Sequence, residues 1–141
     1  MTAGASVAIA ATFVWLGMVT AISFMEAPLK FRAPNATIPI CLGIGRLVFR
    51  ALNAAEFLLA AVIAVTFAIE RPTVGIAVSY AVALAMLAAQ VLAVRPALGR
   101  RADQVLSGLD APRSRAHYAY VALELIKVAA LVPLGILLLS R

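Results

Sequence analysis

The feature that most constrains the fold of this chain is a set of long apolar stretches without a charged side chain. Residues 3–25 and 74–94 contain no Asp, Glu, Lys or Arg, and residues 57–69 show the same pattern. A helix over the 23 residues of the first stretch rises 1.5 Å per residue and spans a ~30 Å hydrocarbon core with some tilt. These stretches therefore predict helices that cross a membrane.

Composition excludes a sizeable water-soluble domain. The chain has 141 residues, of which 65% are hydrophobic and 13% charged, whereas soluble domains carry about 25% charged residues. We predict an all-α integral membrane protein, a four-helix transmembrane bundle that forms one domain over residues 1–141. The expected spans are about 3–25, 45–69, 74–94 and 116–140. Four alanine-rich helices bury little by themselves, so a homo-oligomer or a partner in a membrane complex is also expected.

The distribution of basic residues predicts the orientation in the membrane. The net charge is +6, and the basic side chains flank apolar segments rather than forming a nucleic-acid-binding tract. Nine of them lie at the first and third connections, whereas Arg71 and Arg141 lie at the other end. Because Lys and Arg concentrate in cytoplasmic loops, both termini are expected outside. The loops of about 26–45 and 95–115 are then cytosolic.

A polar stripe runs into the second span. Arg46, Arg50, Asn53 and Glu56 follow one another at steps of four, three and three residues. Side chains at these steps share a face of an α-helix. The residues after Glu56 are apolar, so the stripe is expected to reach from the membrane surface into the hydrocarbon. Charge at that depth costs at least about 2.5 kcal/mol per group unless it is paired or faces a cavity.

The fourth span carries a second stripe. His117, Tyr120, Glu124 and Lys127 are spaced by three, four and three residues. Both helices enter from the same side, so they are expected to be parallel, with the two stripes at similar depths. One interpretation is a buried ion-pair network that fixes helix register, with Arg50 paired to Glu124 and Glu56 to Lys127.

The other interpretation is a polar pocket that opens to the cytosol and binds a ligand. Arginines near its mouth favour an anionic ligand, because the guanidinium group suits carboxylate or phosphate. No metal site is expected, since the chain has one His and one Cys. The candidate ligand-binding residues are Arg46, Arg50, Asn53, Glu56, Gln90, His117, Tyr120, Glu124 and Lys127.

A family resemblance adds to this interpretation. The basic run Leu29-Lys30-Phe31-Arg32 and the pattern Arg46-x6-Asn53-x2-Glu56, with Arg50-Ala51 inside it, occur here in sequence. Over residues 27–56 the chain thus resembles the first loop and second helix of the MAPEG family, the membrane-associated proteins of eicosanoid and glutathione metabolism. The resemblance implies a trimer with glutathione bound between subunits by Arg46 or Arg50, Asn53 and Glu56.

Three functions are open on this basis. The first is a transferase-like membrane enzyme in which Arg95 or Arg101, the candidate catalytic residues, stabilises the thiolate of bound glutathione. The second is a small proton-coupled transporter with Glu56, Glu124 and His117 as its proton path. The third is a non-catalytic accessory subunit whose charges hold helices or a partner in place.

Overall fold

A computed structural model describes residues 2–108 and 115–141, and this part of the chain is almost entirely helical. The α-helices are α1 (Ala3–Val19), α2 (Ala27–Lys30), α3 (Ile38–Ile69), α4 (Val74–Ala89), α5 (Arg95–Leu106) and α6 (Arg115–Ser140). Two π-helical segments, η1 (Thr20–Glu26) and η2 (Gln90–Val94), join α1 to α2 and α4 to α5. Four of the resulting helical stretches are long and apolar enough to cross a membrane. The expected all-α four-helix architecture is confirmed.

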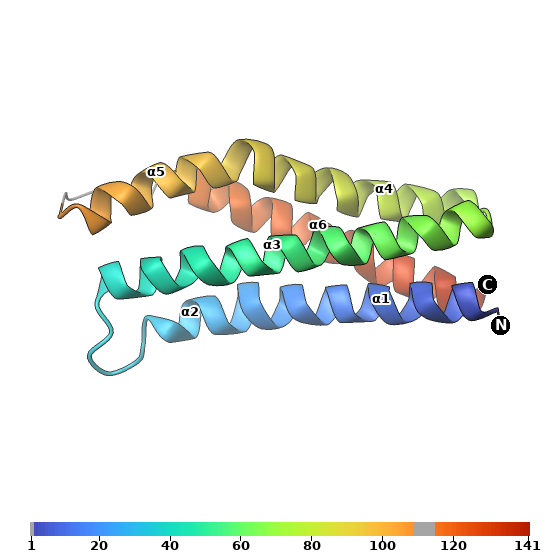
Figure 1. Cartoon of the computed structure of the whole chain (residues 1–141), viewed down its shortest axis with the longest axis horizontal. Helices are drawn as coiled ribbons and strands as arrows, with labels where there is room; N and C mark the ends of the chain where they lie inside the picture. The colour runs from blue at the N-terminus through green and yellow to red at the C-terminus, as the bar shows by residue number, and fades with distance from the viewer. Residues whose placement is uncertain (1, 109–114) are drawn as a thin grey trace.

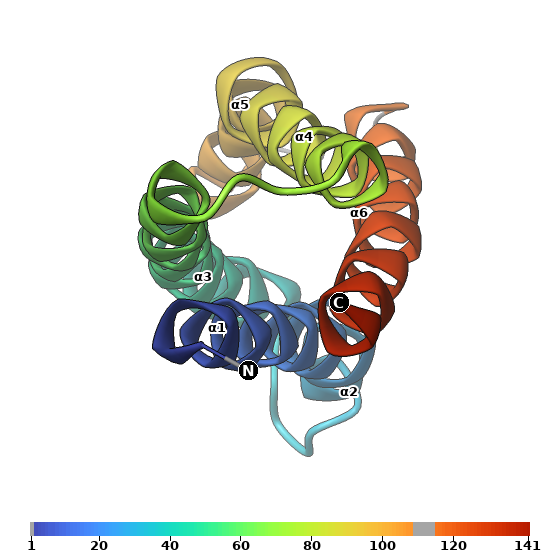
Figure 2. The ribbon, with the colours of Figure 1, turned by 90° about the vertical axis from the view of Figure 1, so that its right-hand side faces the viewer.

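The four long stretches alternate in direction along the bundle. Both termini lie at one end, here called the terminal end, and the connection between α2 and α3 lies at the other, here called the loop end (Figure 1). Seen along the bundle, the helices form a ring in the order α1, α3, α4 and α6 (Figure 2). Helices α3 and α6 therefore lie diagonally across the ring and run in the same direction. This agrees with the parallel arrangement expected for the two helices that carry the polar stripes. Which end faces the cytosol stays a prediction.

Two of the helices extend further toward the loop end than expected. Helix α3 begins at Ile38, and the side chain of Thr37 caps it by accepting a hydrogen bond from the Ile40 amide. Residues 95–106, expected to be loop, form α5. The expectation was wrong because a polar segment can still be helical: Arg, Ala, Leu and Gln, which make up most of this segment, are good helix formers. Helix α4 thus continues through η2 into α5.

The π-helical segments continue α1 and α4, which lie diagonally opposite each other in the ring (Figure 2). Segment η1 carries Ser23 and η2 begins at Gln90. Such segments are rare, and single π-helical turns within α-helices are frequent at functional sites. Because their turns are wider than those of an α-helix, they also change the direction in which the side chains after them point around the helix axis. Neither segment was expected, because no local sequence pattern distinguishes it from α-helix.

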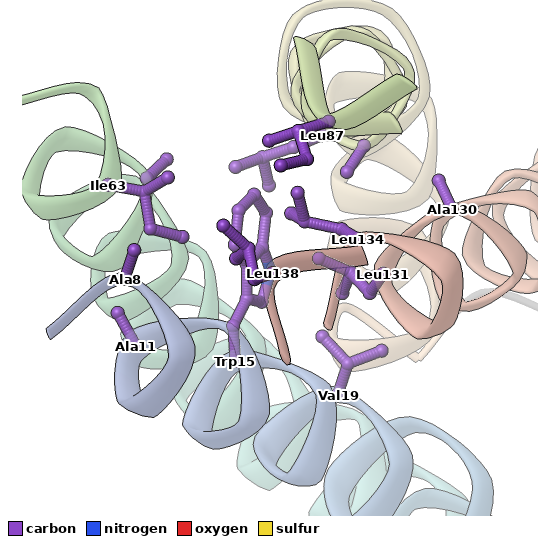
Figure 3. Packing of buried hydrophobic residues seen from close by; sticks show 13 residues of the cluster. Ala8, Ala11, Trp15, Val19, Ile63, Leu87, Ala130, Leu131, Leu134 and Leu138 are labelled. Atoms are coloured by element: carbon purple, nitrogen blue, oxygen red, sulfur yellow. The ribbon is translucent and has the colours of Figure 1, made fainter. Parts of the chain in front are cut away.

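The half of the bundle nearer the terminal end is closed by an apolar core. Trp15 is fully buried and reaches from α1 into the middle of the ring. Figure 3 shows Trp15, Leu87 of α4 and Leu131, Leu134 and Leu138 of α6 pointing into the ring, where they belong to one buried cluster. The outer surface is also apolar: the side chains of Leu58, Val65 and Val78 are exposed. Continuous apolar surface of this kind is typical of contact with lipid.

Helices α1 and α6 approach each other closely at Gly135. A Cβ atom at this position would lie 2.7 Å from Cζ of the Phe13 ring. We expect Gly135→Ala to reduce the free energy of unfolding by about 1–3 kcal/mol, because overpacking forces a rigid ring to move. Gly17→Ala is the matched control, since nothing lies within 4 Å of that position. Unfolding in mixed SDS micelles measures both, and equal stability of the two variants would contradict the close packing at Gly135.

Candidate functional site

Lys127 is the centre of a buried cluster of polar side chains. Its ammonium group lies 2.5 Å from Glu56 Oε1 and 2.6 Å from Glu124 Oε1, and it donates to Gln90 Oε1 at 2.8 Å. Lys127 and its three partners are almost fully buried. The ammonium group is thus paired with two carboxylates and hydrogen-bonded to one amide oxygen. The expected pair of Glu56 with Lys127 is confirmed.

The two carboxylates of this cluster have further donors from other helices. Trp15 Nε1 donates to Glu56 Oε1 and Asn53 Nδ2 to Glu56 Oε2, both at 2.9 Å. Ser23 Oγ donates to Glu124 Oε2 at 2.7 Å. All four long helical stretches therefore contribute to one network, which we call the buried network: Trp15, Ser23, Asn53, Glu56, Gln90, Glu124 and Lys127. Buried charges persist in a protein only when they are paired and hydrogen-bonded in this way.

A pocket lies on the loop-end side of the buried network. Its volume is about 200 Å³, and α2, α3, α5, α6 and η1 form its walls. Four cationic side chains line it, Lys30, Arg46, Arg95 and Arg101, together with His117. Glu124 is the one carboxylate among the lining residues, and it is already paired with Lys127. The lining as a whole is therefore basic.

Arg95 joins the pocket to the buried network. Its guanidinium group lies 5.1 Å from the ring centre of Phe49 and 5.0 Å from that of Tyr120, distances at which a cation is attracted to the ring. Nη2 donates to Asn53 Oδ1 and to Tyr120 Oη, each at 3.2 Å. Nε is buried and has no hydrogen-bond partner among the described residues. One donor of this positively charged group is thus left unsatisfied inside the protein.

Lys30 and Arg46 are held in the pocket wall by their own contacts. Lys30 Nζ passes over Gly45, where a Cβ atom would lie 2.8 Å from Nζ. The same Nζ atom lies 3.8 Å from Glu26 Oε2. Arg46 Nη2 donates to Asp103 Oδ1 at 2.6 Å and to the Gly99 carbonyl at 3.0 Å. The Arg46 contacts fasten α5 to α3. The absence of a side chain at Gly45 gives the lysine its path into the pocket.

The predicted site residues fall into three places. Arg46, His117, Tyr120 and Glu124 line the pocket, as do the candidate catalytic residues Arg95 and Arg101. Asn53, Glu56, Gln90 and Lys127 lie in the buried network and are not among the lining residues.

Arg50 belongs to neither group. Its side chain is exposed, and among the described residues it forms no ion pair, so the expected Arg50–Glu124 pair was wrong. At 100° per residue, Arg50 and Glu56 point about 120° apart. The stripe is therefore too wide for all its members to face inward.

Several residues of the site were missing from the sequence-based set. Trp15, Ser23 and Phe49 contribute a hydrogen bond or a ring contact. A Trp in the middle of an uncharged span must find an acceptor for its indole N–H, and this requirement was the available signal. Phe49 lies one helical turn from Arg46, but nothing in the sequence marks it.

Comparison with known proteins gives no further assignment. The chain matches no model of a protein family, no curated protein and no solved structure. The resemblance to the MAPEG family is thereby neither supported nor refuted. The basic pocket and the buried network beneath it are the features from which a function is argued.

Proposed function

We propose that this membrane protein binds a small anion in the pocket at the loop end. The observation that carries the proposal is the basic lining of the pocket, to which Arg95, Lys30, Arg46 and Arg101 contribute positive charge. Arg95 in addition has a buried Nε atom without a hydrogen-bond partner among the described residues. An anionic group would compensate this charge, and arginine suits carboxylate or phosphate.

The size of the cavity favours a small anion or a headgroup. Drug-sized ligands occupy pockets of about 300–1,000 Å³, and this pocket measures about 200 Å³. A glutathione-dependent transferase is one form of the proposal, as the family resemblance implies. In that case Asn53 and Glu56 would act indirectly, because both are bonded within the buried network. Arg95 and Arg101 would then be the residues next to the ligand.

The other two functions have weaker support. A proton-coupled transporter needs a polar route to the terminal end, and the described core there is built mainly of apolar side chains. An accessory subunit accounts for the buried network but leaves the partnerless Nε of Arg95 without a role. Anion binding accounts for both features, since the network fixes Asn53, which holds Arg95 toward the pocket.

Isothermal titration with inorganic phosphate, pyrophosphate and glutathione tests the proposal on protein purified in a neutral maltoside detergent. We expect at least one anion to bind, and Arg95→Gln to weaken that binding at least ten-fold because it removes the charge and the Nε donor. Arg100→Gln is the matched control: it lies on the same helix, is exposed and does not line the pocket.

A second pocket variant shows whether Arg95→Gln weakens anion binding directly or only by destabilising the bundle. Lys30→Gln removes a cation that has no hydrogen bond to the buried network, so the bundle should keep its stability while anion affinity falls. The fluorescence of the single tryptophan, Trp15, reports folding of each variant. Unchanged affinity in both Lys30→Gln and Arg95→Gln would refute the proposal, as would the lack of binding by every anion tested, in this titration and in the alkyl phosphate titration below.

A further inference from the structure

The wall of the pocket has an apolar lip. Phe24 of η1 and Val121 of α6 line the pocket and are 38% and 37% exposed, so each faces both the cavity and the surroundings of the bundle. The hydrogen bond from Ser23 to Glu124 joins the same two elements just toward the terminal end. On the terminal side of that bond, α1 packs along α6. On the loop side, η1 and α2 make few contacts with α6. The side of the pocket between η1 and α6 is therefore only loosely closed.

The lip lies at the depth where lipid headgroups meet hydrocarbon. At 1.5 Å per residue, Val121 is about 28 Å along α6 from Ser140. Phe24 is about 31 Å from Ala3 on the same basis. The hydrocarbon core of a bilayer is ~30 Å thick. When the terminal end is placed at one surface of the core, the lip falls at the other surface.

Lys30, Arg46 and His117 lie beyond the lip, on the headgroup side, whereas Arg95, about 31 Å along its helix from Val74, lies at the depth of the lip. Helix α6 places His117 about 6 Å further from Ser140 than Val121. Lys30 and Arg46 come from the parts of α2 and α3 that are nearer the loop end than Phe24 and Glu56. An apolar opening at the edge of the hydrocarbon thus leads to a cavity with a basic lining.

We infer that the anion is the headgroup of an amphiphile whose hydrocarbon chain leaves the pocket between Phe24 and Val121 and enters the bilayer. This inference rests on the proposed anion site and specifies the class of its ligand. A cavity of about 200 Å³ holds a phosphate or carboxylate headgroup but leaves little room for a long chain. The exposed lip gives the chain an apolar exit at the correct depth.

Titration with three probes at a fixed concentration of maltoside micelles tests the inference. Dodecyl phosphate carries both the anion and the chain, inorganic phosphate only the anion, and dodecylphosphocholine the chain with a zwitterionic headgroup. We expect dodecyl phosphate to bind at least ten-fold more tightly than either of the others, because only it satisfies both the basic lining and the apolar lip. Dodecanoate in a fourth titration distinguishes a carboxylate headgroup from a phosphate.

A variant at the lip separates the chain from the headgroup. Val121→Trp narrows the opening, and we expect it to weaken dodecyl phosphate at least five-fold more than it weakens inorganic phosphate. Leu125→Trp is the matched control, because Leu125 is 55% exposed on the same helix and does not line the pocket. Thermal unfolding of both variants shows that each remains folded.

The outcomes distinguish this inference from the proposed function. If inorganic phosphate binds as tightly as dodecyl phosphate, or Val121→Trp has no effect, the inference is wrong and the anion site stands. If dodecylphosphocholine binds as tightly as dodecyl phosphate, the site recognises the hydrocarbon chain and does not distinguish the net charge of the headgroup. The inference is then also wrong. If no anion binds, with or without a chain, the proposed function fails and the inference fails with it.

Discussion

Replacing Lys127 with Met is expected to reduce the free energy of unfolding by about 3–5 kcal/mol. The variant removes the cation that lies between Glu56 and Glu124 and leaves two carboxylates buried without a counter-charge. Breaking a buried ion pair on one side costs this much because the remaining charge is uncompensated. Unfolding in mixed SDS micelles, followed by the fluorescence of Trp15, measures the loss.

Two control variants separate the loss of charge balance from the loss of shape. Arg50→Met also removes a cation from a polar stripe, but Arg50 is exposed and forms no ion pair among the described residues, so its effect should be below about 0.5 kcal/mol. The triple variant Glu56→Gln, Glu124→Gln and Lys127→Met removes all three charges, and we expect it to be more stable than Lys127→Met alone. Equal stability of the two would show that charge compensation is not what Lys127 provides.

Trp15→Ala is expected to have an effect of similar size, about 3–5 kcal/mol, because it leaves a cavity in the middle of the ring. Within a bilayer this cost arises from lost van der Waals packing more than from exclusion of water. Trp15→Phe keeps most of the ring but removes the hydrogen bond to Glu56 Oε1, and we expect about 1.5–3 kcal/mol for the loss of a bond to a charged group.

Far-ultraviolet circular dichroism at rising SDS fraction measures the Trp15 variants, since they lack the fluorescent probe. Phe57→Ala is the control, because Phe57 is 41% exposed on the outer surface of α3. The expected order of stability is Phe57→Ala, then Trp15→Phe, then Trp15→Ala. A Trp15→Phe variant as stable as the Phe57→Ala control would mean that the indole contributes packing only.

The polar residues illustrate how far helical spacing alone can carry a prediction. The spacing of Glu56 and Lys127 places both at the same depth on parallel helices, and the pair forms. Spacing also placed Arg50 on the stripe, but its direction differs from that of Glu56 by about 120°, and it lies outside. A stripe defines a range of directions, and only the packing of the neighbouring helices decides which part of that range faces the interior.

The sequence by itself determined the four spans, the parallel direction of α3 and α6, and a polar region away from the terminal end. These follow from hydropathy and helix periodicity, which are local properties of the chain. The tertiary structure decided that the polar residues form a buried network and an adjoining basic pocket, which share Ser23 and Glu124. It also joined Arg95 to Asn53 and Tyr120, and placed Phe24 and Val121 in the wall of the pocket. Such contacts depend on η1, η2 and α5, whose phase and continuation are set by packing between helices distant in sequence.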